Sequence, residues 1–404
     1  MTASQKYGVI YQVDYEALEG MKVMQVVNNH EILKHVEAGD FVISMRSFQG
    51  GLEYSDNTGS VSSAYVAIKP TEMAFPSFYK YLFKSKTYIQ ALQSTSNLVR
   101  DGQALRYSNF VQVDLPLPPQ SEQKAIARFL DRETANIDEL IASQEDLIRL
   151  LNEKRQAVIS HAVTKGLDSN APMKPSGIEW LGDIPAHWEV QRLGRRVQSI
   201  SSGTSVNSSD EPASNDEIAV LKTSCVYSGT FDVTQNKKVV PEEYERVSCP
   251  VTAGALIVSR MNTPDLVGAA GLATLTVDNV FLPDRLWKVE FHGLVPEFAH
   301  LWTRSASYRT EVRLACAGTS SSMQNLSQDE FKAFTIAVPP ETEQIAIARD
   351  VDAKLIQFDA LENESTWSIS LLKERRAALI SAAVTGKIDV RSEVELPEDE
   401  AIPA

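Results

Sequence analysis

Two short segments carry residue types that could perform metal or acid–base chemistry. The segment His30-Glu31-Ile32-Leu33-Lys34-His35 is one position away from the H-E-x-x-H zinc motif. Because each helical residue adds about 100°, the five steps from His30 to His35 place the two imidazoles about 140° apart. Two side chains that far apart around a helix do not bind one ion. We therefore predict no metal site in this chain.

The second segment, Glu122-Gln123-Lys124 with Asp114 upstream, resembles the E-x-K pattern of some nucleases. An equivalent later segment reads Glu343-Gln344-Ile345 and lacks the lysine. A carboxylate in the first turn of a helix complements the helix dipole, so we interpret Glu122 and Glu343 as helix-start residues.

Other catalytic motifs are missing from the sequence. It contains no glycine-rich phosphate loop, no nucleophile elbow and no Asn/Asp-Pro-Pro-aromatic tetrapeptide of amino-methyltransferases. We predict that the chain is not an enzyme and has no cofactor of its own.

An internal repeat organises the chain. The segment Pro118–Arg128 returns as Pro339–Arg349, 221 residues later, and the register holds without a gap to Asp168 and Asp389, with 23 identities in 51 positions. Weaker matches precede it: 41–44 aligns with 256–259 at an offset of 215, and Phe78 and Tyr88 align with Phe298 and Tyr308 at 220. The chain therefore consists of two copies of one module, with pseudo-twofold symmetry as the expected consequence.

The strongly repeated segment predicts two long helices. Prolines precede each copy, Ser121 and Thr342 are suitable N-caps, and Gly166 and Gly386 are natural stops. About 44 helical residues span roughly 65 Å. Apolar residues at alternating steps of four and three indicate a coiled-coil seam: Leu130, Ile137, Ile141, Ile148, Leu151, Val158 and Ala162 in the first helix, and Val351, Leu355, Phe358, Ile369, Leu372, Leu379 and Ala383 in the second.

A long helix with an apolar stripe requires a partner. One possibility is an intermolecular dimer. Because both helices belong to one chain, we favour antiparallel pairing within it, with Arg155 and Arg376 at equivalent seam positions fixing the register.

The segments before each helix have short apolar runs and Gly and Ser clusters, typical of mixed α/β domains. The expected order is a domain at 1–118, a helix at 119–166, a linker at 167–182, a domain at 183–338, a helix at 339–388 and an acidic disordered tail at 389–404. About 33 residues at the start of the second domain have no counterpart in the first, so we expect the first domain to be truncated at its N-terminus.

Composition restricts the class of protein. The three cysteines form no C-x-x-C pair, and no stretch is apolar enough to span a membrane or to serve as a signal peptide, so we expect a cytoplasmic protein. The net charge is −14, but the last sixteen residues hold one basic and six acidic side chains, and the two domains are nearly balanced. Balanced domains permit DNA binding on one face.

Together these segments resemble the specificity subunit of type I restriction-modification systems. The similarity lies in the duplicated P-P-x-[ST]-E-Q segments, in Ala162-Val163-Thr164-Lys165-Gly166, and in the linker from Ser176-Gly177-Ile178-Glu179-Trp180 to His187-Trp188-Glu189-Val190. The resemblance implies a fold with two target-recognition domains held apart by two long antiparallel helices, each domain reading half of a bipartite, asymmetric DNA site. It also implies partners, namely two adenine-N6 methyltransferase subunits and motor-nuclease subunits, with S-adenosylmethionine, ATP and magnesium bound by those partners.

DNA contacts require Lys or Arg for phosphates and forked donors for base edges. On this basis the candidate DNA-binding residues are Arg46, Gln49, Arg100 and Arg106 in the first domain, and Lys237, Lys238, Arg260 and Asn262 in the second. Ordinary surface charge is the alternative for each of them. Trp180 and Trp188 are expected to be packing anchors. The competing functions are a coiled-coil protein scaffold without DNA specificity and a free-standing nuclease.

Overall fold

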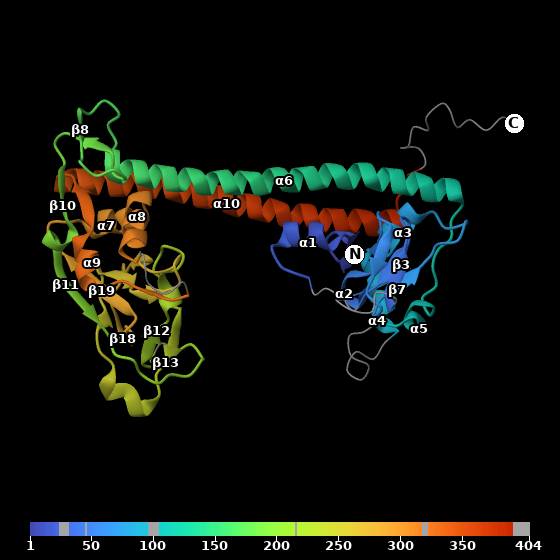
Figure 1. The fold of residues 1–404 in the computed structure, drawn as a ribbon, viewed down its shortest axis with the longest axis horizontal. Helices are drawn as coiled ribbons and strands as arrows, with labels where there is room; N and C mark the ends of the chain where they lie inside the picture. The colour runs from blue at the N-terminus through green and yellow to red at the C-terminus, as the bar shows by residue number, and fades with distance from the viewer. Residues whose placement is uncertain (24–31, 45–46, 96–104, 215, 317–321, 391–404) are drawn as a thin grey trace. The chain divides into compact units, whose positions relative to one another are not determined.

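The computed structural model describes the chain except residues 24–31, 45–46, 96–104, 215, 317–321 and 391–404 (Figure 1). It divides into a first unit, residues 1–146 with 364–404, and a second unit, residues 147–363. Two long helices, α6 at Gln120–Lys165 and α10 at Glu341–Val384, each contribute one part to the first unit and the other part to the second. The predicted acidic tail lies almost entirely outside the described residues.

The first unit is a small α/β domain built on one part of α6 and one part of α10. Its strands are β1 Thr2–Ser4, β2 Gly8–Ile10, β3 Lys34–Val36, β4 Phe41–Ile43, β5 Glu53–Tyr54, β6 Gly59–Val61 and β7 Val66–Ile68. They form antiparallel pairs β1-β2 and β3-β6 and an antiparallel sheet of order β5-β4-β7. Its short helices are α1 Gln12–Glu19, α2 Ser47–Gly50, α3 Pro76–Leu82, α4 Lys86–Ser94 and α5 Tyr107–Phe110.

The second unit contains a larger α/β domain. Its strands are β8 Met173–Pro175, β9 Asp183–Pro185, β10 Glu189–Arg192, β11 Val197–Ser202, β12 Ala219–Leu221, β13 Asn236–Lys238, β14 Pro250–Val251, β15 Leu256–Ser259, β16 Met261–Asn262, β17 Ala270–Leu272, β18 Val277–Phe281, β19 Leu286–Phe291, β20 Gln324–Asn325 and β21 Thr335–Val338. Its helices are α7 Pro296–Thr303, α8 Ala306–Ala315 and α9 Gln328–Ala333, with 3-10 turns η2 Leu193–Arg195, η3 Thr223–Val226 and η4 Pro241–Arg246.

Two four-stranded sheets form the body of this second domain. One has the order β11-β19-β15-β17 and is antiparallel; the other has the order β13-β12-β18-β14, with β12 and β18 parallel. The pair β10-β21 brings the start of the domain next to its end, directly before α10. Trp188, Trp287 and Trp302, all at most 1% exposed, lie in the core that also contacts α6 and α10.

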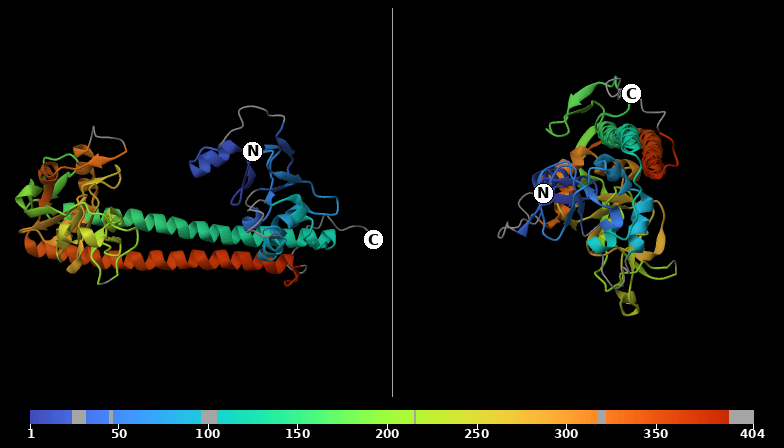
Figure 2. Two further views of the ribbon diagram at one scale, coloured as in Figure 1. Left: turned by 90° about the horizontal axis from the view of Figure 1, so that it is seen from below. Right: turned by 90° about the vertical axis from the view of Figure 1, so that its right-hand side faces the viewer.

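Within each unit the parts of α6 and α10 are antiparallel (Figure 2). In the first unit, Ile126 and Leu130 near the start of α6 share a core with Ile380 and Ala383 near the end of α10. In the second unit the reverse holds, because Ile159 near the end of α6 shares a core with residues near the start of α10. The predicted seam residues are all buried or half-buried, so the intramolecular coiled coil is confirmed.

One detail of the helix prediction is wrong. The helices begin at Gln120 and Glu341, so Ser121 and Thr342 lie in the first turn and are not N-caps. The cause is the proline that directly precedes each helix, since its fixed φ already has the helical value and the helix starts immediately after it.

The two domains share a helical hairpin, α3-α4 in the first unit and α7-α8 in the second. Both hairpins open with a proline, and both second helices have a serine N-cap. Ser85 Oγ accepts a hydrogen bond from the amide of Tyr88, and Ser305 Oγ accepts one from Tyr308, each at 3.3 Å. The internal repeat therefore extends from the long helices into both domains.

Candidate nucleic-acid interface and its supports

A buried glutamine explains the repeated P-P-x-[ST]-E-Q segment. Gln123 is 0% exposed; its Oε1 accepts from the Phe75 amide at 2.7 Å, and its Nε2 donates to carbonyls of Met73 and Pro118. The equivalent Gln344 is 1% exposed, accepts from the Val295 amide at 2.7 Å and donates to the Pro339 carbonyl at 2.9 Å. In both units this side chain fixes the start of a long helix to the start of the domain's helical hairpin.

The equivalent arginines of the seam pair across the two helices, as predicted. Arg376 forms a bidentate ion pair with Asp138, with Nε–Oδ1 and Nη2–Oδ2 distances of 2.8 and 3.1 Å. Arg155 donates to Asp359 Oδ1 at 2.6 Å and to Glu362 Oε2 at 3.1 Å. Their partners come from the opposite helix in the same unit, so these arginines fix the register of the pairing.

The candidate DNA contacts of the first domain are only partly visible. Arg46 and Arg100 lie outside the described residues. Gln49 lies on the exposed side of α2, and Arg106 is exposed directly before α5, where its main-chain amide donates to Asn109 Oδ1. The contact of Gln49 and of Arg106 with DNA stays a prediction.

In the second domain, Lys237 and Lys238 lie on strand β13 and not on a loop. Lys237 pairs with Asp210 at 2.5 Å and Lys238 pairs with Glu217. These hydrogen bonds lower the pKa of both carboxyl groups. DNA binding by either lysine requires it to exchange a carboxylate for a phosphate.

Asn262 is 8% exposed and its amide is already engaged. Its Nδ2 donates to the hydroxyl of Tyr227 at 2.7 Å and to Ser259 Oγ at 3.3 Å, while its Oδ1 accepts from the Thr263 amide. Arg260 precedes it, half-buried, with an Nε that has no hydrogen-bond partner among the described residues. Asn262 therefore holds the hydroxyl of Tyr227 in position, and the tyrosine, at 36% exposed, is the more accessible of the two side chains.

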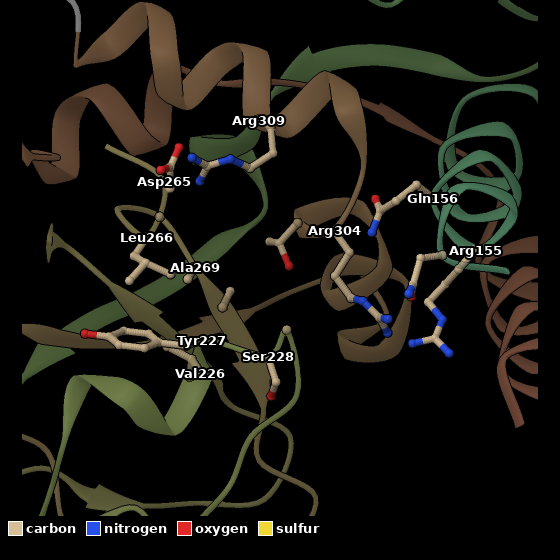
Figure 3. Close-up of a pocket in the computed structure, with 15 residues that line it drawn as sticks. Arg155, Gln156, Val226, Tyr227, Ser228, Asp265, Leu266, Ala269, Arg304 and Arg309 are labelled. Atoms are coloured by element: carbon tan, nitrogen blue, oxygen red, sulfur yellow. The ribbon is translucent and has the colours of Figure 1, made fainter. Parts of the chain in front are cut away.

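Tyr227 lines a pocket of about 330 Å³ that sequence reasoning missed (Figure 3). Arg155 and Gln156 of α6 form one wall, and the hairpin α7-α8 contributes Arg304 and Arg309. We call it the arginine pocket, after Arg155, Arg304 and Arg309. No local sequence pattern predicts this pocket, because its walls come from α6 and from the hairpin α7-α8, which lie about 150 residues apart in the sequence.

The two linker tryptophans have different roles. Trp188 is fully buried and packs edge-on against Phe298 at 6.5 Å between ring centroids, which confirms a packing anchor. Trp180 is 39% exposed, and its Nε1 donates to Glu311 Oε1 at 3.2 Å. That glutamate also accepts the Thr335 amide, so Trp180 ties the linker to the domain.

The described residues also bear on metal binding and on membrane insertion. Among the described residues, no group of three His, Cys, Asp or Glu side chains is placed to hold a metal ion. In the same part of the chain, no helix combines the length and apolarity needed to cross a membrane.

Comparison with known families shows which proteins the chain is similar to. Residues 8–149 match the family model described as the type I restriction modification DNA specificity domain. A similar curated protein is the specificity subunit of type I restriction enzyme EcoKI from Escherichia coli (strain K12), 24% identical over 386 residues, covering 94% of this chain and 79% of the relative. Another is the StySPI specificity subunit from Salmonella potsdam, 20% identical over 390 residues with the same coverages.

Solved structures agree on the fold. The chain superposes with a TM-score of 0.67 and 16% identity on a chain of the structure described as "Structural basis underlying complex assembly and conformational transition of the type I R-M system", covering 88% of this chain and 84% of that one. The HsdS subunit from Thermoanaerobacter tengcongensis gives a TM-score of 0.50 at 17% identity, with coverages of 88% and 83%. Taken together, the comparisons show that the chain is similar to specificity subunits of type I restriction-modification systems and shares their fold.

Proposed function

We propose that this chain is the non-catalytic subunit that reads a bipartite, asymmetric DNA site and assembles methyltransferase and motor-nuclease subunits around it. The observation that carries the proposal is the internal repeat itself. Each unit combines one α/β domain with antiparallel parts of the same two helices. Two readers joined by shared continuous helices suit a site made of two half-sites at a set separation.

Recruitment of two like partners is supported by equivalent exposed leucines outside the seam. Leu140 and its repeat equivalent Leu361 are 51% and 45% exposed, and Leu150 and Leu371 are 52% and 50% exposed. The first unit holds Leu140 and Leu371, and the second holds Leu361 and Leu150. Each unit therefore displays the same pair, as expected of two docking sites for two copies of one partner.

Asymmetric reading is supported by differences between the domains. The second domain carries two four-stranded sheets, whereas the widest sheet described in the first has three strands. Two unlike surfaces would read unlike half-sites. On this proposal S-adenosylmethionine, ATP and magnesium act on the partner subunits.

The test is co-expression with a methyltransferase subunit encoded beside this chain, followed by mapping of N6-methyladenine in the host DNA. We expect one motif of two short specific tracts separated by a non-specific gap of constant length. A complex that assembles but methylates no split sequence would contradict DNA reading and would leave the protein scaffold as the better interpretation.

A second experiment tests the two docking sites by native mass spectrometry. The pair of changes Leu140→Glu and Leu371→Glu is expected to reduce the bound methyltransferase subunits from two to one, and so is Leu150→Glu with Leu361→Glu. Ser143→Glu and Gln357→Glu, at exposed polar positions of the same helices, are the matched controls and should keep both copies. Retention of two copies by both leucine variants would rule out these sites.

A further inference from the structure

The arginine pocket of the second unit contains one guanidinium group, that of Arg304, which forms no ion pair among the described residues. Arg155 is paired with Asp359 and Glu362, and Arg309 donates to the carbonyls of Val267 at 2.6 Å and Pro264 at 3.0 Å. Among the described residues the side chain of Arg304 makes no hydrogen bond or ion pair. Figure 3 shows the Arg304 and Arg155 guanidinium groups pointing toward one another.

The surroundings of the Arg304 guanidinium disfavour its positive charge. Burial, and then the positive charge of Arg155, lower the pKa of Arg304, and Asp359 opposes this only in part. Asp265 also lines the pocket, and in Figure 3 its carboxylate lies beside Arg309. Arg155 already has two carboxylate partners, so the charge left without an ion pair is that of Arg304, and an anion beside its guanidinium would stabilise it.

The internal repeat supplies a comparison for this arrangement. Arg304 follows α7 as Lys84 follows α3, at the offset of 220, and in the first unit Lys84 Nζ pairs with the fully buried Glu53 at 2.6 Å. Glu53 lies opposite Val42 on β4, whereas the residue opposite the matching Ile257 on β15 is Gly271. The first domain therefore supplies its own carboxylate, and the second domain has glycine at that position.

The Arg304 side chain is also held in place. Gly229 has φ of 76°, and a Cβ there would lie 3.5 Å from Arg304 Nε, so the guanidinium packs on bare backbone. The Gly229 carbonyl accepts a hydrogen bond from His300 Nε2 at 2.7 Å. A preorganised, unpaired fork of donors suits a tetrahedral or planar oxyanion.

The neighbours of the pocket favour a phosphate of DNA over other anions. Tyr227 lines the pocket, and its hydroxyl is held by Asn262, in the same segment as Arg260, where sequence reasoning places DNA contacts. Gln156 and Ser228 add neutral donors on either side. We propose, on the basis of the proposed function, that the arginine pocket binds one backbone phosphate of the target duplex between Arg304 and Arg155.

The test measures DNA affinity of the assembled complex with its methyltransferase subunits, by fluorescence anisotropy over a range of salt concentrations. With Arg304→Gln we expect roughly tenfold or greater loss of affinity, equal for specific and scrambled duplexes, because a charge-assisted contact to the backbone is removed. The slope of log K against log salt should fall by about 0.9, the value for one phosphate. Arg304→Lys keeps the charge and should keep the slope while losing part of the affinity.

The control is Arg195→Gln, which removes the same charge from an exposed position of the second unit outside the pocket. Its DNA affinity and its salt slope should both equal those of the unchanged protein. The thermal midpoint of the free Arg304→Gln chain should equal or exceed that of the unchanged protein, since a buried unpaired charge is removed; a decrease would indicate a structural role and overturn the proposal. An unchanged salt slope, loss of methyltransferase binding instead of DNA binding, or a response to inorganic phosphate alone would each overturn it. A wild-type complex that binds no DNA would refute the proposed function itself, a different outcome from a variant that binds like wild type.

Discussion

The repeated glutamine makes a quantitative prediction about stability. In Gln344→Leu the side-chain volume is nearly kept, but the Val295 amide and the Pro339 carbonyl lose their partner. A buried or partly buried main-chain group left without a hydrogen bond costs about 1–3 kcal/mol. Two such groups, less the gain from burying leucine, lead us to expect that the second unit loses about 2–4 kcal/mol of unfolding free energy.

Urea unfolding followed by tryptophan fluorescence measures this loss. Four of the five tryptophans, at positions 180, 188, 287 and 302, belong to the second unit, so the signal reports mainly on it. Gln357→Leu, at an exposed position of α10 in the same unit, is the control and should change stability by less than about 0.5 kcal/mol. If Gln344→Leu behaved like this control, the glutamine would not hold the helix to the domain and our explanation of the repeated motif would be wrong.

Three further predictions concern charge. Burial lowers the pKa of His300 to about 4, so the unfolded chain binds a proton before the folded chain as pH falls below 6.5. The unfolding free energy of the second unit should therefore fall by about 3 kcal/mol between pH 6.5 and pH 4. Urea midpoints measured over this range should fall in the unchanged protein and stay level in His300→Gln. Burial raises the folded-state pKa of Glu53, although Lys84 opposes the shift. The stability that this carboxyl group contributes should therefore be fully present below pH 4.5 and decline as pH rises above that value. The thermal midpoint of Glu53→Gln should not show this decline with pH. Asp138→Asn breaks the exposed pair with Arg376 and should cost less than about 1 kcal/mol in low salt and nothing measurable in about 1 M salt, by thermal unfolding in both buffers.

The sequence predicted the long helices and their pairing well because both depend on short-range periodicity. Residues three and four apart lie on one helix face, so the seam from Leu130 to Ala162 is visible in the sequence alone. Arg155 and Arg376 stood out for the same reason, as polar residues inside that stripe. Their carboxylate partners lie more than 200 residues away in sequence, and only the antiparallel pairing brings them close.

The site was predicted less well because it depends on contacts between distant segments. Gln123 and Gln344 were visible as a repeated residue, yet their partners lie 48 to 50 residues upstream on a turn whose position no local pattern gives. Asn262 was chosen as a forked donor, and the fold uses its amide internally to hold Tyr227. In the sequence, Arg304 resembles any basic residue at the end of a helix. Only the strand pairing shows that Gly271 takes the place of Glu53, the carboxylate that pairs with the equivalent Lys84.

The two copies of the module differ where the proposed function requires them to differ. Features that attach each domain to the helices are present twice, including the glutamine, the serine cap of the hairpin, the seam arginine and the exposed leucines. The charge around the hairpin is not repeated, because Lys84 forms an ion pair with Glu53 whereas Arg304 forms none among the described residues. Assembly with two like partners requires the first set to match, and recognition of an asymmetric duplex requires the surfaces beyond it to diverge. Within each unit, therefore, the contacts that attach the domain to the helices are repeated, whereas the charge beside the helical hairpin is not.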